Sequence, residues 1–444
     1  MTKTAALMLL IFFRVINSCA QPLTYYKDVQ PIVLNKCAPC HRPGESGPFS
    51  LLDYEDVKKR NSFIKDVVKS GYMPPWKADN NYVHFANDRS LTSREKDIII
   101  KWINSNAPPG RPLNKPVIAE SPVTGTMYNR EPNLVLKASD SFFVKGDGIE
   151  RFVIFKIPYE LPDSANVEAV EFFSNDKKLV HHANYAVHAV PDTSIDITKT
   201  DPFINLTEDD RKKFDQYQPY RKTITYYGGW IPGTSYESYP GDIGWIMPRR
   251  GVILLTVHFA PSARDRQSIN GVNFFFKKTP IRRTVKVISF GSGGIGQDDI
   301  RPIFYLLPNE KKRFTLDVMN PGENFSIMYV WPHMHYLGKE FKAYILKPDG
   351  DTIKLVNIPD WDFRWQEIYR FKKLIVAPKG SILHIEGYYD NSAANPFNPN
   401  SPPQMIGSTG DMKSTDEMLT LMMVFLPYRA GDENFILDNR KLAK

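Results

Sequence analysis

Length, composition and charge exclude several classes of protein. The chain has 444 residues, too many for one ordinary hydrophobic core, so about two or three domains are expected. It carries 13% aromatic residues and 35 prolines, which favours strands and loops over long helices. The formal charge is +8, but Lys and Arg form no run of the kind that marks nucleic-acid binding. This charge indicates a solvated basic surface, or weak attraction to an acidic partner or an anionic membrane.

Residues 1–20 have the pattern of an export signal, with a positive start and then a short apolar stretch. Two processing routes fit: cleavage before Gln21, or lipidation of Cys19, because Ile16–Cys19 resembles a lipobox. We therefore expect an exported protein, either periplasmic or anchored to a bacterial cell envelope through lipidated Cys19. No later stretch is apolar over about 18 residues, so no membrane-spanning helix is expected.

The most specific motif is Cys37-Ala38-Pro39-Cys40-His41, which spells C-x-x-C-H, the attachment pattern of a c-type haem. Two thiols at this spacing can each form a thioether to one porphyrin, and His41 then becomes an axial ligand of the iron. We expect one covalent haem, attached to Cys37 and Cys40. No cysteine follows Cys40, so no disulfide is possible in the rest of the chain.

The sixth iron ligand is predicted to be Met73, within Gly71-Tyr72-Met73-Pro74-Pro75-Trp76. A thioether ligand stabilises ferrous iron and raises its potential, and the two prolines would hold the loop rigid. Two alternatives stay open: Met73 packs in the core, or His84 is the ligand.

Residues 22–106 are predicted to form a small helical domain. An amphipathic stretch leads into the haem motif, Tyr54–Ser70 carries apolar residues at helical spacing, and Ser93 is a good N-cap for a helix over Arg94–Asn104. A proline-rich linker is expected over 107–132.

From residue 133 the pattern changes to short apolar runs separated by turn residues, which predicts an all-β region. A break near Lys277–Arg283 would divide it into antiparallel sandwich or jelly-roll lobes over 133–279 and 280–432. The predicted strands include Arg151–Ile157, Leu179–Val190, Val252–Phe259, Val285–Phe290, Phe325–Trp331 and Ile382–Tyr389.

Three histidines within these runs, His181, His182 and His258, are candidate metal ligands. Neighbouring residues of a regular strand face opposite sides, so His181 and His182 can share one metal only at a strand end or a bulge. His188 lies on the same face as His182 but about 20 Å away in a straight strand, so we expect a structural role for it.

A second candidate site is His333-Met334-His335 with Met418. Positions i and i+2 of a strand face the same way, so His333 and His335 can chelate one ion while Met334 points away. A thioether beside imidazoles selects copper over zinc. The alternative is that Met418, like the methionines that follow it, fills hydrophobic space.

In order and spacing, these residues resemble the copper type II, ascorbate-dependent monooxygenases, which include peptidylglycine α-hydroxylating monooxygenase and dopamine β-monooxygenase. The resemblance covers about 133–430 and extends to flanking residues. The N-terminal part is similar to small cytochrome c domains fused to such modules in bacteria. Together they imply a multidomain fold: a small all-α cytochrome c-like domain followed by two all-β antiparallel jelly-roll lobes. The matching segments are His181-His182, Leu255-Thr256-Val257-His258-Phe259, His333-Met334-His335-Tyr336-Leu337-Gly338-Lys339 and Ser414-Thr415-Asp416-Glu417-Met418.

The resemblance implies two coppers, one in each lobe. The His181/His182/His258 copper would store an electron, and the His333/His335/Met418 copper would bind O2 and hydroxylate a C–H bond of a small molecule or peptide. Ascorbate usually supplies the electrons in this family. Here the haem would pass them on from an external donor, such as a cytochrome, a quinol-linked protein or an ascorbate-like reductant.

The chain departs from the peptidylglycine enzymes near the second site. Trp331 stands where they have an arginine that grips the substrate carboxylate, and Thr420 and Met422 replace an Asn and a Tyr. A peptide ending in glycine is therefore not expected as substrate, and an apolar or aromatic one fits Trp331 better. Two other functions stay open: a non-catalytic electron-transfer or copper-binding cytochrome, and a zinc hydrolase. His384 has no assigned partner and is taken as structural.

Overall fold

The computed structural model describes residues 22–112, 130–208, 211–234, 236–320, 322–408 and 416–437. The export signal, Cys19 and most of the predicted linker lie outside these residues. Strands make up 39% of the described residues and helices 15%. Of the helices in the described residues, none combines the length and the apolar character that crossing a membrane requires.

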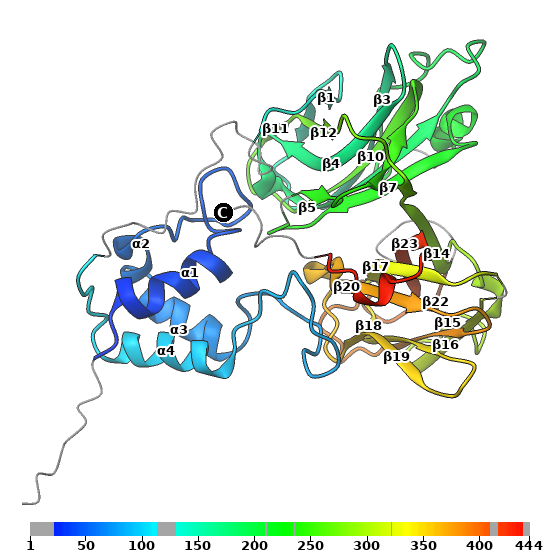
Figure 1. Cartoon of the computed structure of the whole chain (residues 1–444). Helices are drawn as coiled ribbons and strands as arrows, with labels where there is room; N and C mark the ends of the chain where they lie inside the picture. Colours follow the sequence, from blue (N-terminus) through cyan, green and yellow to red (C-terminus); the bar gives the residue numbers. More distant parts are fainter. Residues whose placement is uncertain are drawn as a thin grey trace, which may run out of the picture.

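Five short helices lie at the N-terminal end, drawn in blue in Figure 1. The last begins with a capping box in which Thr92 and Glu95 bond reciprocally, so the N-cap is Thr92 and Ser93 is the first helical residue. Their apolar faces meet around the fully buried Tyr25 and Trp102. The five are the π-helix η1 (Tyr25–Val29) and the α-helices α1 (Gln30–Lys36), α2 (Tyr54–Lys58), α3 (Asn61–Lys69) and α4 (Ser93–Asn104).

The predicted fold class is wrong. Within the described residues the structure is mostly β-sheet, its α- and π-helices are these five short ones, and no all-α cytochrome c-like domain is shown. One physical reason is that a segment within 22–106 belongs to the core of a β unit. Phe85 and Ala78 are buried among its strands, the Asp79 amide donates to Asn357 O at 2.8 Å, and the Ala86 amide donates to Arg370 O at 2.7 Å.

The first β unit, green in Figure 1, pairs a six-stranded sheet with a five-stranded one. Apolar residues on their facing sides form one large core. The six-stranded sheet runs β1 (Leu134–Lys137), β12 (Asn270–Phe276), β4 (Ala165–Ser174), β9 (Ile243–Met247) and β13 (Arg283–Thr284), with β8 (Glu237–Ser238) also on β4. The five-stranded sheet runs β6 (Phe203–Asn205), β3 (Arg151–Glu160), β10 (Arg250–Phe259), β5 (Val180–Ala189) and β7 (Ile224–Trp230).

The second β unit, yellow-green to red in Figure 1, pairs two four-stranded sheets. One runs β14 (Lys286–Gly291), β23 (Thr420–Pro427), β17 (Phe325–His333) and β20 (Tyr369–Ala377). The other runs β16 (Lys311–Met319), β21 (Ile382–Asp390), β18 (Gly338–Leu346) and β19 (Thr352–Ile358). The remaining elements are β2 (Phe142–Val144) with β11 (Arg266–Ser268), β15 (Tyr305–Leu306) with β22 (Ile406–Gly407), and the 3-10 helices Lys177–Leu179, Arg211–Tyr220, Gln297–Asp299, Phe363–Trp365 and Asp432–Asn434.

The two β units share a continuous buried junction. Trp331 of β17 packs against Gly229 of β7, where a Cβ atom would clash with the indole ring. Beside it, the buried Glu237 of β8 accepts hydrogen bonds from the hydroxyls of Tyr239, at 2.5 Å, and Tyr329 of β17. This junction fixes how the strand ends that carry the histidines meet.

Candidate metal centre

A bulge in β5 turns two adjacent histidines toward one site. His258 of β10 pairs with His182, but Phe259 pairs with Val180, so His181 is the extra residue in the ladder. The extra residue breaks the strict alternation of side chains between faces. Ligand nitrogens of His181, His182 and His258 lie within 4.8 Å of one another as a result. The sequence allowed His181 and His182 to share one metal only at a strand end or a bulge, and β5 has a bulge at this point.

In two residues of this histidine triad, His181 and His258, one ring nitrogen is hydrogen-bonded to the surrounding protein. His181 Nε2 lies 3.0 Å from Arg364 O, which can only accept, so Nε2 carries the proton and Nδ1 has the lone pair. His258 Nε2 lies 3.2 Å from Glu150 Oε2, so its Nδ1 also faces inward. The two Nδ1 atoms are 3.2 Å apart. Two imidazole–metal bonds of about 2.0–2.1 Å, the length known for zinc, span this separation at an angle of about 100°.

Burial keeps the imidazoles of His181 and His182 neutral. It lowers the pKa of His181 to about 4, with a further contribution from neighbouring His258. It also holds the pKa of His182 well below its usual value. Neutral imidazole is the form that binds metals, so protons do not compete for this site near pH 7.

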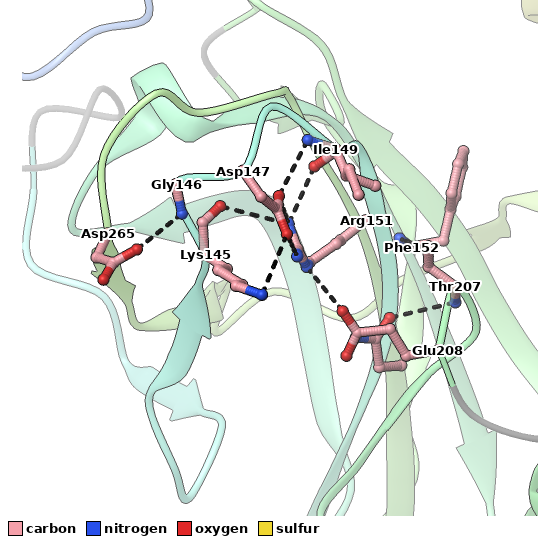
Figure 2. Close-up of polar contacts among 10 residues, drawn as sticks. Lys145, Gly146, Asp147, Ile149, Arg151, Phe152, Thr207, Glu208 and Asp265 are labelled. Carbon is pink, nitrogen blue, oxygen red and sulfur yellow. Dashed lines mark hydrogen bonds and ion pairs between the residues drawn. The ribbon is translucent and has the colours of Figure 1, made fainter.

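The strand that supports His258 is anchored by an arginine clamp, shown in Figure 2. The buried Arg151 guanidinium binds Asp147 at 3.0 and 2.6 Å and Glu208 at 3.3 Å, which fixes the start of β3. On either side of Arg151, Glu150 binds His258 and the Phe152 ring stacks on the His258 ring at 3.9 Å. The clamp thus holds the two residues that orient His258.

A cavity of about 260 Å³ lies beside this clamp and contains none of the candidate ligands. It is separate from the histidine site. Its lining residues are Phe142, Phe143, Lys145, Arg151, Phe203, Asn205 and Glu208.

His333 and His335, the histidine pair at the end of β17, show the opposite ring orientation. His333 Nδ1 donates to Gln366 Oε1 at 2.7 Å, and His335 Nδ1 donates to Asp416 O at 2.8 Å. Their Nε2 atoms, left with lone pairs, face each other at 3.1 Å. Burial lowers the pKa of His333. Facing lone pairs repel unless a cation lies between them. The histidine pair, like the histidine triad, therefore has the donor chemistry of a metal site.

Met418 lies at the edge of this pair, just before β23. The ladder aligns His333 with Thr420, which brings Met418 alongside His335. The buried Glu417 side chain joins the two segments, because it accepts hydrogen bonds from the amides of His335 at 2.9 Å and Met418 at 3.2 Å. The donor set of two imidazoles and a thioether fits copper. Met418 as a ligand stays a prediction.

Phe363 lies between the two histidine groups. Its ring centroid is 5.5–6.3 Å from those of all five histidines, and 4.6 Å from that of Tyr336. The triad and the pair therefore face a common space from the two β units. Sequence reasoning missed Phe363, Arg364, Gln366 and Glu150, which carry no motif or periodic signal.

The haem motif lies at the end of α1. Cys37 and Cys40 are free thiols, and burial raises the pKa of Cys37 to about 12. His41 Nδ1 lies 3.1 Å from Phe49 O, which leaves Nε2 free for an axial bond. These donors fit a c-type haem. Met73 follows α3, with its amide bonded to Val67 O, and its role as sixth ligand stays a prediction.

Other predicted residues have different surroundings. Trp331 is buried in the junction between the β units, so its ring is not exposed for substrate. His188 is buried, and its Nδ1 has no partner in the described residues. His384 Nδ1 lies 2.7 Å from Asp317 at the surface, far from the histidine groups in the ladder.

Comparison with known proteins adds little. No protein-family model and no curated protein matches the chain. Among solved structures, the major capsid protein P2 of bacteriophage PM2 is 8% identical with a TM-score of 0.23, covering 67% of this chain and 98% of that one. A particle structure of infectious bursal virus is 9% identical with a TM-score of 0.15, covering 67% and 75%. An oxalate decarboxylase of Bacillus subtilis is 8% identical with a TM-score of 0.12, covering 68% and 79%.

Proposed function

We propose that the protein is a copper-dependent monooxygenase that hydroxylates a C–H bond with O2, and that a covalent haem c supplies the electrons. The observation that carries the proposal is the convergence of two histidine groups, each with facing lone pairs, on one space around Phe363. Bound copper would supply one-electron transfer and O2 activation. The reaction balances as C–H plus O2, two electrons and two protons, giving C–OH and water.

The protein's own residues divide the work. His181, His182 and His258 would hold one copper through ring nitrogens, and His333, His335 and Met418 would hold the other. Gln366 and Glu150 fix the ring orientations from outside the ligand set. The buried Phe363 ring lies between the groups and contacts the rings of both.

Cys37 and Cys40 would carry the haem, with His41 as one axial ligand and Met73 as the other. The haem would receive single electrons from an external donor, a small redox protein or reductant outside the membrane.

The first test is metal content and visible spectrum of the exported, purified protein. We expect one haem and two coppers per chain, and an oxygen-dependent hydroxylated product with a suitable substrate. His258→Ala and Met418→Ala should each lower copper to about one per chain, while His384→Ala, a surface control, keeps both. Zinc or no metal at the histidines would overturn the proposal. If the protein contains both coppers but forms no oxygen-dependent product, the alternative function, a non-catalytic electron carrier, is supported instead.

A further inference from the structure

One segment of the second β unit contacts both histidine groups. It is Phe363–Glu367, between β19 and β20. Phe363 lies against all five histidine rings, the Arg364 carbonyl bonds to His181, and the Gln366 side chain bonds to His333. We call these residues the bridging segment.

The other side of the bridging segment contacts Tyr72 and Arg89, two residues of the N-terminal part that carries the haem motif. The Trp365 ring meets the Tyr72 ring edge-on at 6.0 Å, and Tyr72 directly precedes Met73. Glu367 forms an ion pair with Arg89. A Cβ atom at Gly233 would lie 2.6 Å from Cys40 Sγ and would clash with Arg89, so Cys40 and Arg89 share one small region.

Within the segment, Trp365 is the aromatic group that points to the haem side. Its indole N–H is buried without a partner among the described residues, so no hydrogen bond from them holds the ring there. From Trp365 to His181 the path is one peptide bond to the Arg364 carbonyl and one hydrogen bond of 3.0 Å. The path to His333 is longer, because it runs through the whole Gln366 side chain. Electron tunnelling favours the route with fewer bonds and no gap.

We propose that Tyr72 and Trp365 form the electron entry to the histidine triad, and that the Arg364 carbonyl passes the electron to His181. The inference rests on the proposed function, since it needs a haem at Cys37/Cys40 with Met73 as its sixth ligand and copper at the triad. One electron leaves ferrous iron, which becomes ferric, and reduces Cu(II) to Cu(I). No atom or proton moves, so no further reactant is needed.

The test is intramolecular electron transfer in the full chain loaded with haem and copper. A photogenerated flavin semiquinone reduces the haem within a short pulse, and reoxidation of the haem by Cu(II) is followed at the haem absorption band without oxygen or substrate. The variants are Trp365→Leu, Trp365→Phe and the exposed Tyr72→Leu. Phe397→Leu is the matched control, because the Phe397 ring contacts the Arg364 guanidinium from outside this route.

We expect Trp365→Leu and Tyr72→Leu to slow the first-order reoxidation roughly tenfold, which corresponds to about 1.4 kcal/mol of barrier. Trp365→Phe should slow it less, and Phe397→Leu should leave it unchanged. Wild-type rates in both Leu variants, with haem and copper content intact, would overturn this inference alone. Absence of haem or copper in the wild type would overturn the proposed function, and this inference with it.

Discussion

Glu417 offers a direct test of how the histidine pair is held beside Met418. Its buried carboxyl accepts three amide hydrogen bonds, from His335, Leu337 and Met418, at 2.9, 2.6 and 3.2 Å. Burial raises the pKa of Glu417 to about 8, so the neutral acid prevails at pH 7 and each bond contributes about 1 kcal/mol. Glu417→Ala removes all three, and should lower the free energy of unfolding by about 3 kcal/mol. In Glu417→Gln the amide oxygen can still accept from His335 and Met418, but the NH2 group cannot accept from the Leu337 amide. Loss of that one hydrogen bond should lower the free energy of unfolding by about 1–3 kcal/mol.

The assay is urea unfolding at pH 7, together with copper content per chain. We expect the wild type to be the most stable, Glu417→Gln to be less stable and Glu417→Ala to be the least stable. The variants should lose copper at the histidine pair and retain copper at the triad. Glu323→Ala is the matched control, since its side chain is 93% exposed and should change stability by less than about 0.5 kcal/mol. An Ala variant as stable as the wild type, with both coppers, would refute the reasoning.

Three further predictions concern single residues. Burial raises the pKa of Glu237. Above about pH 4.3 the unfolded chain loses the Glu237 proton while the folded protein keeps it. The free energy of unfolding should therefore fall by about 1.4 kcal/mol per pH unit until the pH reaches the pKa of Glu237 in the folded protein. Glu237→Gln should flatten this slope in urea unfolding from pH 4.5 to 7, and an unchanged slope would contradict it. Glu150→Gln removes the carboxylate on His258 and should weaken copper binding at the triad about 10–100-fold in chelator competition; equal affinity would exclude that role. Gly229→Ala should clash with Trp331 and destabilise the protein by about 1–3 kcal/mol in thermal unfolding, and unchanged stability would contradict this.

Short apolar runs between turn residues were a reliable guide to strands. The predicted strand Val252–Phe259 lies within β10, Phe325–Trp331 within β17, and Ile382–Tyr389 within β21. The reason is that burial on a sheet face leaves a period of two in the sequence. The expectation that His181 and His182 could share a metal only at a strand end or a bulge also followed from that period, and the ladder contains a bulge there.

Contacts between distant parts of the chain left no such signal. Arg364 and His181 are 183 residues apart, and Glu150 and His258 are 108 apart. The helical spacing of 22–106 did not show that Phe85 belongs to the core of a β unit. Local periodicity reports which face of an element is buried but not which partner covers it, and this is why the all-α domain was predicted wrongly.

The two histidine groups differ in a way that neither spacing nor composition could reveal. The triad presents Nδ1 atoms and the pair presents Nε2 atoms, because Arg364 O and Glu150 bind the outer nitrogens in one group and Gln366 and Asp416 O bind them in the other. Each arrangement places two ring nitrogens about 3 Å apart in a buried space, where they repel when both carry lone pairs. A bound cation removes that repulsion, so metal binding and folding are coupled at both groups. Metal removal should therefore lower stability even in a variant that has lost all turnover.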